Sequence, residues 1–358
     1  MLYETPHLTP TLQSRLDELD GLRDVLGRNV SQPLRWMGPL RRSLRARSFQ
    51  GSTSIEGYSV SPEEAIAIVD GGASTDSGDE NRQAFACYAR AMDRVGTLAL
   101  DPAFRWLDRV ILDLHFDACY FQRDKGPGLW RTGPIGVTAS DGSLEFRGPD
   151  ADAVPGLMAE VVEWLQEGDL GANPVVRAAM AHLHVTSVHP FRDGNGRVSR
   201  IVQSLVLARE GLMSPEFSSI EEYLGENTPA YYAALREVQD GGYRPERDAS
   251  SWIEFCVEAH IAQAQRRLTE VEEAAARWDR LGALVGDRGW PDRLVIALEQ
   301  SLIGGTDRGR FGEEAEVSMA TASADFRRLL DAGLVERRGK GRSTRYHASE
   351  RLRAELPS

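Results

Sequence analysis

The sequence contains little cysteine and no long apolar segment. Of its 358 residues only three are cysteines, Cys87, Cys119 and Cys256, and no two of them form a CxxC pair. This spacing supports neither a cysteine zinc cluster nor a disulfide framework, and it favours a reducing, cytoplasmic location. No stretch of about 18 apolar residues occurs, so we expect no membrane-spanning helix. The first twenty residues also lack the basic start and apolar run of a signal peptide.

Positive charge is in deficit. The chain has 42 Lys and Arg residues against 54 Asp and Glu residues, a formal net charge of −12. This balance argues against a protein that coats nucleic acid or an anionic membrane through its bulk charge, although a local basic patch remains compatible with it. Hydrophobic residues make up 41% and charged residues 27%, as in ordinary globular proteins. The length suggests two or three domains.

Most of the chain has the apolar periodicity of helices, for example over residues 12–26 and 83–98. The glycine-rich stretch 126–149 differs, because an Asp-Gly pair separates two short apolar segments, and this predicts a β-hairpin. We therefore expect a mainly α fold. The predicted parts are an N-terminal helical region over 1–100, a core over 101–260, a helical connector over 261–287 and a small module over 288–358.

Residues 189–200, with the sequence HPFRDGNGRVSR, hold the most informative pattern. A Gly-Asn-Gly run at the entry to a helix leaves backbone N–H groups free to bind an anion. Arg197 and Arg200 are expected on one face of that helix, where both can bind phosphate oxygens. Asp193 suits Mg²⁺, and His189 is the nearby group whose ordinary pKa suits proton transfer near neutral pH. Together they indicate phosphoryl or nucleotidyl transfer.

This segment resembles the signature motif of the Fic family, His-x-Phe-x-(Asp/Glu)-Gly-Asn-Gly-Arg-x-x-Arg, at every defining position. The sequence PGLWR at 127–131 resembles the opening of the family's β-hairpin flap. The resemblance extends weakly over most of residues 40–260. It implies a Fic-type helical bundle with a flap over 126–149.

By this resemblance, the reaction is adenylylation: AMP moves from ATP to a Ser, Thr or Tyr hydroxyl of a target protein, or of the chain itself. His189 would deprotonate the hydroxyl, Asp193 would hold Mg²⁺, and Ile135 and Val137 of the flap would pair with the target backbone. The residues implied to bind the ATP phosphates are Gly194, Asn195, Gly196, Arg197 and Arg200.

Tyr232 and Gln239 lie in a helical segment that resembles the family's adenine-binding segment. A pair of tyrosines on a helix (here residues 231 and 232) is as readily explained by core packing, so both interpretations stay open. The histidines at 182 and 184 are two residues apart, unlike the helical metal-binding spacing of HExxH, and we expect them to be core residues.

Residues 52–57, with the sequence STSIEG, match the Fic inhibitory motif (Ser/Thr)-x-x-x-Glu-(Gly/Asn) at Ser52, Glu56 and Gly57. The resemblance implies that Glu56 pairs with Arg200 and occupies the position of the ATP γ-phosphate. A solvated helix end is the alternative, because the motif is short. Its place upstream of a complete Fic motif favours an N-terminal inhibitory helix.

The C-terminal residues 319–348 predict a helix and an arginine-rich hairpin, which together resemble a winged helix-turn-helix. Seven basic residues face only two acidic ones between positions 326 and 346. This local excess suits phosphate contacts with DNA. Binding of another protein, or dimerisation, is the alternative, and family resemblance favours a homodimer.

Two classes of function remain. The first is a self-inhibited adenylyltransferase, with ATP and protein hydroxyls as partners. The second is a DNA-binding regulator that uses its Fic domain as a nucleotide sensor. Within the enzyme class, removal of AMP or transfer of another nucleotidyl or phosphate-containing group also fits the motif.

Overall fold

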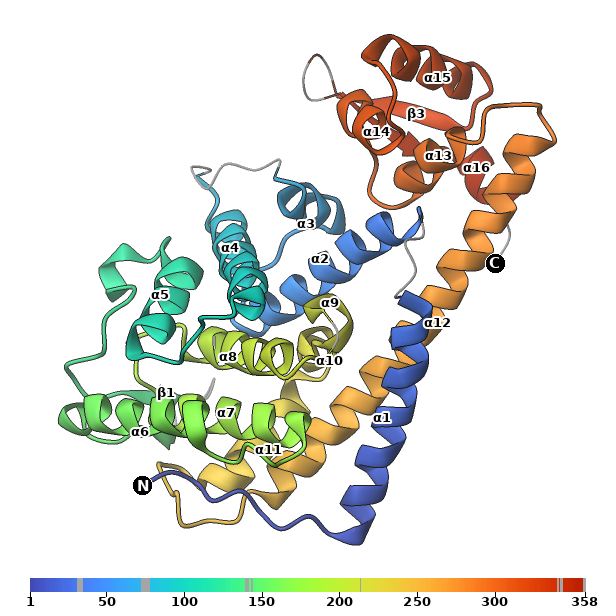
Figure 1. Cartoon of the computed structure of the whole chain (residues 1–358). Helices are drawn as coiled ribbons and strands as arrows, with labels where there is room; N and C mark the ends of the chain where they lie inside the picture. Colours follow the sequence, from blue (N-terminus) through green and yellow to red (C-terminus); the bar gives the residue numbers. More distant parts are fainter. Residues whose placement is uncertain are drawn as a thin grey trace. The chain divides into compact units, whose positions relative to one another are not determined.

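The computed structural model describes residues 1–30, 35–71, 78–138, 142, 144–212, 214–339, 341 and 344–356 (Figure 1). These residues are mainly α-helical, as the sequence predicts, with two separate two-stranded antiparallel sheets. Asp141 of the predicted hairpin turn lies outside the described residues, as do Lys340 and Arg342 of the basic C-terminal hairpin. Among the described helices, none has the length and apolar character of a membrane span.

The chain divides into two compact units, and each contains several separate stretches of sequence. The first unit comprises residues 1–24, 47–60 and 71–265, and the second comprises 25–46, 61–70 and 266–358. The predicted divisions after residues 100, 260 and 287 do not coincide with these bounds. One reason is that three of the changes between units fall inside a helix, where helical periodicity continues without a break. These helices are α1 (Pro10–Val30), α2 (Met37–Ile55) and α12 (Ser250–Gly286).

The first unit is built around α7 and α8, which pack against each other, while α4 contacts both α5 and α8 (Figure 1). Asn173 starts α7 by accepting a hydrogen bond from the Val175 N–H at 2.9 Å, and Pro174 occupies the first turn. Past that first proline, every residue of α7 is buried. The helices of this unit that lie within it are α4 (Glu80–Leu100), α5 (Asp108–Cys119), α6 (Val154–Glu167), α7 (Pro174–Val188), α8 (Asn195–Arg209), α9 (Pro215–Ser218), α10 (Glu221–Glu226) and α11 (Thr228–Gln239), with short 3₁₀ turns at Arg123–Lys125 and Ala151–Ala153.

The predicted flap is present as an antiparallel hairpin of β1 (Gly136–Thr138) and β2 (Leu144–Arg147). The Arg147 N–H donates to the carbonyl of Gly241 at 3.0 Å, so β2 is paired on its second edge as well. Among the described residues, β1 pairs with β2 alone. Its outer edge therefore has backbone groups available to another chain.

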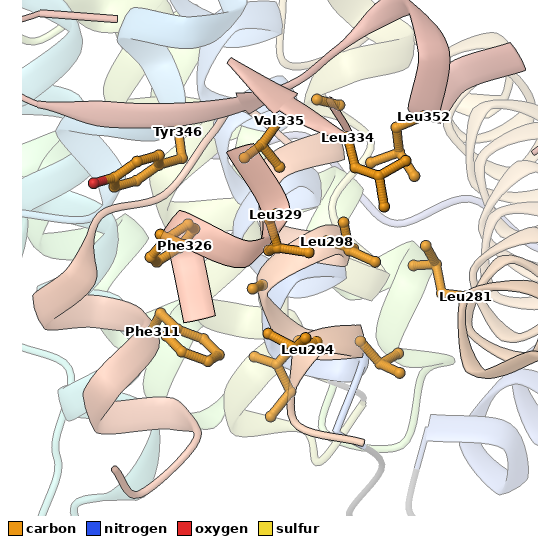
Figure 2. Close-up of a cluster of buried hydrophobic side chains, with 14 of the residues drawn as sticks. Leu281, Leu294, Leu298, Phe311, Phe326, Leu329, Leu334, Val335, Tyr346 and Leu352 are labelled. Atoms are coloured by element: carbon orange, nitrogen blue, oxygen red, sulfur yellow. The ribbon is translucent and has the colours of Figure 1, made fainter. Parts of the chain in front are cut away.

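The second unit has its own apolar core, to which the end of α12 contributes Leu281 and Val285 (Figure 2). Within this core, the Phe326 ring stacks on the Tyr346 ring, with 4.0 Å between the ring centres. It packs edge-on against the Phe311 ring, with 5.3 Å between the ring centres. The elements of this unit are α3 (Pro62–Val69), α13 (Leu294–Leu302), α14 (Arg308–Glu314), α15 (Met319–Asp331), the hairpin of β3 (Val335–Arg338) and β4 (Arg345–Ala348), and α16 (Glu350–Glu355).

The helix α15 and the C-terminal hairpin agree with the helix and hairpin expected over residues 319–348, whereas the short helices α14 and α16 were not predicted. The sequence of α14 is RGRFGEE, whose two glycines and seven residues give no helical period to detect. The interpretation of this unit as a winged helix, its DNA or protein partner, and the homodimer stay predictions.

Candidate active site

A cavity of about 290 Å³ in the first unit collects most of the predicted site residues. Its walls come from the end of α2, the flap, the loop between α7 and α8, and α11. The predicted residues that line it are Glu56, Ile135, Val137, His189, Asp193, Gly194, Asn195, Gly196, Arg200, Tyr232 and Gln239. Ser52, Gly57 and Arg197 are not among its lining residues.

His189 ends α7 in the left-handed region, with φ of 49° and ψ of 58°. Its Nδ1 lies 3.0 Å from the carbonyl oxygen of Thr186. Because a carbonyl only accepts, the neutral ring carries its proton on Nδ1 and keeps the lone pair of Nε2 free. Burial, with Arg131 as a further cause, lowers the pKa of His189 below 6.5. The ring is therefore an unprotonated base at neutral pH.

The loop after His189 is held closed by its own side chains. The side-chain amide of Asn195 forms two hydrogen bonds with the backbone of Phe191. Its Oδ1 accepts from the Phe191 N–H at 2.8 Å, and its Nδ2 donates to the Phe191 carbonyl at 2.9 Å. Phe191 is fully buried and its ring stacks on His115 at 3.6 Å. Arg131 donates to the His189 carbonyl at 2.8 Å. The side chain of Asn195 is therefore engaged in shaping the loop, and only its backbone is available to a ligand.

The first turn of α8 is suited to bind an anion. Gly194 precedes it with φ of 80°, and a Cβ at this position would lie 2.3 Å from Cys119 Sγ, so only glycine fits. The N–H groups of the first turn have no acceptor within the helix, and the helix dipole adds to their positive end. A Cβ on Gly196 would lie 2.6 Å from Glu56 Oε1 and 3.1 Å from Arg200 Nη1. The missing side chain thus leaves the space that the Glu56 carboxylate occupies.

Arg200 is buried and binds the predicted inhibitory motif. Its Nε donates to Ser52 Oγ at 2.6 Å, and its Nη2 donates to the Ser52 carbonyl at 3.0 Å and to Glu56 Oε1 at 2.8 Å. Burial alone would lower the pKa of Arg200, but Glu56, together with Tyr231 and Tyr88, outweighs this effect, so the pKa is raised. Arg200 Nη1 is buried with no hydrogen-bond partner among the described residues. This atom is left for an acceptor that the protein does not supply.

Arg197 is oriented differently from the expectation that it binds phosphate beside Arg200. Its Nη2 donates to Gln122 Oε1 at 2.9 Å and to Asp193 Oδ1 at 3.2 Å. The guanidinium also lies 5.7 Å from the ring centre of Tyr58. These partners hold Arg197 outside the cavity lining, although it is one turn from Arg200 on the same helix.

Asp193 is fixed by three donors. Its Oδ1 accepts from the Gly194 N–H at 2.5 Å and from Arg197, while Oδ2 accepts from Gln122 Nε2 at 2.7 Å. Its side chain is 35% exposed and the residue lines the cavity. A carboxylate has about four lone-pair positions, so a position on the cavity side remains for a cation.

The two tyrosines of α11 have separate roles. Tyr231 is buried, and its hydroxyl lies 3.0 Å from Nε2 of His182, whose Nδ1 contacts Gln203 at 2.6 Å. Tyr232 is 38% exposed and lines the cavity. Gln239 is the last residue of α11. It lines the cavity, and its Nε2 donates a hydrogen bond to Ser187 Oγ at 3.0 Å. Core packing thus explains Tyr231 and not Tyr232.

Residues 106–207, which include α5, the flap, α7 and the loop with His189, match the family model described as "Fic/DOC family". The chain contains a Fic domain.

Relatives and solved structures are consistent with this assignment. A protein adenylyltransferase, fic-1 of Caenorhabditis briggsae, is 37% identical over 89 residues, which are 25% of this chain and 16% of that protein. A uridine 5'-monophosphate transferase of Xanthomonas campestris is 27% identical over 183 residues, which are 48% of this chain and 34% of that protein. The chain thus spans only 16% and 34% of the length of these two curated relatives.

The crystal structure of a Fic family protein from Desulfovibrio desulfuricans G20 is similar to this chain with a TM-score of 0.61. The match covers 97% of this chain and 99% of that one at 20% sequence identity, so the likeness concerns the fold.

Two residues of the Fic domain's site were missed by sequence reasoning. Gln122 bridges Asp193 and Arg197, and its Nε2 also donates to the Tyr58 hydroxyl at 3.1 Å. Tyr58 directly follows the inhibitory motif, and that adjacency was the one available signal. Nothing in the sequence marks Gln122, which follows α5 and reaches Arg197 only through the fold.

Proposed function

We propose that the protein is a self-inhibited protein adenylyltransferase, which transfers AMP from ATP to Ser, Thr or Tyr hydroxyls of target proteins and of itself. The observation that carries this proposal is one cavity that combines an unprotonated base, His189, with an anion-binding helix end and the unpartnered Nη1 of Arg200. The names of adenylyltransferase relatives support the same reaction.

In the proposed reaction, Nε2 of His189 removes the proton of the target hydroxyl. The hydroxyl oxygen then attacks the α-phosphorus, a new P–O bond forms to the target, and the bond to the β-phosphate oxygen breaks to release pyrophosphate. The Nδ1–H bond to Thr186 keeps the ring oriented and stabilises the imidazolium that results. General bases of this kind contribute about 10²- to 10⁴-fold.

The phosphates would lie against the first turn of α8 and Arg200. Asp193 fits a Mg²⁺ ligand because it is held by Gln122 and Arg197 while its carboxylate stays at the cavity wall. When bound there, Mg²⁺ supplies charge neutralisation for the phosphates. Arg197 acts in this proposal by positioning Asp193. Tyr232 and Gln239 lie where the nucleotide base would be held.

Glu56 inhibits by competition for Arg200. It occupies the Nη2 position that a γ-phosphate oxygen would take, and the space beside Gly196. While Glu56 is bound, ATP is denied its full contacts with Arg200 and lies in a non-productive position. The target segment would approach the open edge of β1 next to Ile135 and Val137 and add as a further strand.

The test is labelling of the purified chain and of a cell extract with α-labelled ATP and Mg²⁺. Glu56→Gly should label strongly, wild type weakly, and Glu56→Gly combined with His189→Ala not at all. Glu145→Gln is the control, because this carboxylate is in the same cavity and pairs with Arg236 at 3.1 Å instead of Arg200. No AMP mass on the Glu56→Gly chain or any extract protein would refute the proposal.

The nucleotide is tested with α-labelled UTP, GTP and CTP in parallel, because one relative is named a uridine 5'-monophosphate transferase. Faster labelling from UTP would replace adenylylation by uridylylation and leave the roles of His189 and Glu56 unchanged. Loss of AMP from a labelled target in wild type but not in the Glu56→Gly chain would indicate AMP removal.

A further inference from the structure

We propose that the second unit regulates the site by holding both ends of the inhibitory segment, defined as residues 47–60. The inference rests on the proposed inhibition by Glu56. A cluster of two ion-paired arginines and two carboxylates, Arg42, Asp70, Arg310 and Glu314, anchors these ends, and we refer to it as the anchor.

The path of the chain is the first observation. Helix α2 begins in the second unit, with residues 37–46, and finishes in the first, with residues 47–55. After residue 60 the chain returns to the second unit for residues 61–70, which include α3. The inhibitory segment is therefore continuous, at both of its ends, with backbone that belongs to the second unit.

The upstream end is fixed by packing and by charge. Leu40 and Leu44 of α2 are buried. Two residues from each of them along α2, Arg42 pairs with Asp70, with Nε 3.6 Å from Oδ1, and with Glu314, with Nη2 3.4 Å from Oε2. Because α2 is one continuous helix, a shift of residues 37–46 is transmitted along its axis.

The downstream end is fixed by α3. Ser61 caps this helix with a capping box to Glu64, and Ile66 is buried. A Cβ on Gly304 would lie 2.6 Å from Ile66 Cδ1, so α3 lies directly against the loop after α13. At its C-terminal end, Asp70 accepts a hydrogen bond from Arg310 Nη2 at 2.9 Å.

The anchor joins these two ends to each other and to α14. Asp70 pairs with both Arg42 and Arg310, and its side chain is only 10% exposed. Burial, with the neighbouring Arg310 as a second cause, lowers the pKa of Arg42. Loss of the Asp70 charge would thus leave two guanidinium groups close together without their shared carboxylate, and the ends of the segment would separate.

The contacts of the inhibitory segment with the Fic site are short-range. Ser52 and Glu56 bind Arg200, and Tyr58 accepts a hydrogen bond from Gln122. Hydrogen bonds of 2.6 to 3.1 Å are lost when the partners move apart by about 1 Å. Small displacements of the ends are therefore enough to separate Glu56 from Arg200, and the anchor prevents them.

The test measures self-labelling by α-labelled ATP in full-length Asp70→Asn, Arg310→Gln and Glu56→Gly chains. Arg351→Gln is the matched control, because Arg351 pairs with Glu355 at 2.8 Å in the same unit and lies outside the anchor. Asp70→Asn and Arg310→Gln should raise the labelling rate on the order of tenfold, a usual size for coupling between two sites, and Arg351→Gln should not.

Asp70→Asn added to Glu56→Gly should give no further increase, because Glu56 is then absent. Wild-type rates in both anchor variants, or an equal increase in the Glu56→Gly background, would overturn the anchor proposal. The Glu56→Gly chain alone tests the proposed inhibition, so the two failures are distinguishable. If thermal melting shows that Asp70→Asn does not fold, Arg42→Gln replaces it. Hydrogen exchange of residues 52–58 is then measured as a second readout. An unchanged exchange rate together with an unchanged labelling rate in Arg42→Gln would also overturn the proposal.

Discussion

Removal of the Glu56 carboxylate should change stability and ATP binding in opposite directions. In Glu56→Ala, Arg200 loses its carboxylate and keeps only its two bonds to Ser52. A hydrogen bond to a charged group contributes about 1.5–3 kcal/mol, and we take about 2 kcal/mol because the Glu56 side chain is 20% exposed. At about 3 °C per kcal/mol, the melting temperature should fall by roughly 6 °C.

The ion pair between Glu56 and Arg200 must break before ATP can make all of its contacts with Arg200. A difference of about 2 kcal/mol corresponds to roughly 30-fold weaker ATP binding by wild type than by Glu56→Ala. At an ATP concentration of about 100 times the Kd of the variant, the variant gains about 2.7 kcal/mol of stability and wild type only about 0.9 kcal/mol. With ATP present, the two melting temperatures should therefore lie within about 2 °C of each other.

The assay is thermal unfolding with and without Mg²⁺ and a non-hydrolysable ATP analogue, on chains that also carry His189→Ala to exclude labelling. Glu56→Gln is the matched control for the charge, because it preserves size and an acceptor oxygen, and it should give intermediate shifts. Equal ATP-induced shifts in wild type and Glu56→Ala would refute the competition between Glu56 and nucleotide.

Three further predictions concern the catalytic loop. Because burial lowers the pKa of His189, the base form is complete at neutral pH, and the labelling rate of a Glu56→Gly chain should fall only as pH drops below about 6.5; a decline that begins above pH 7 would contradict this. Gln122→Ala should weaken Mg²⁺ binding about tenfold with little change in Mg²⁺-free ATP binding, measured by calorimetry, because Asp193 loses the donor to Oδ2. Gly194→Ala should lower the melting temperature markedly, since its Cβ would lie 2.3 Å from Cys119 Sγ at φ of 80°, whereas an unchanged melt would show that the loop adapts.

The sequence predicted the features that depend on neighbouring residues. The helix that follows the Gly-Asn-Gly run and the flap hairpin each depend on residues a few positions apart, and both are present. The Glu56 contact with Arg200 joins residues 144 positions apart and was available only through resemblance of motifs.

The sequence could not predict the direction of Arg197. Helical spacing places it near Arg200, but its guanidinium is directed by Gln122, which lies 75 positions away and belongs to no pattern. The division into units was hidden for a similar reason, because α2 is uninterrupted where the chain passes from one unit to the other. Helix α14 was missed because its stability comes from burial of Phe311 and not from its own sequence period.

The backbone of His189 has a consequence for variants that remove the base. A non-glycine residue with φ of 49° is held in a conformation that costs about 1 kcal/mol, which glycine would not incur. His189→Gly loses the packed ring and its contact with Thr186 but relieves this backbone strain, whereas His189→Ala loses the same contacts and keeps the strain. Of these two variants, the glycine variant should therefore have the less strained end of α7.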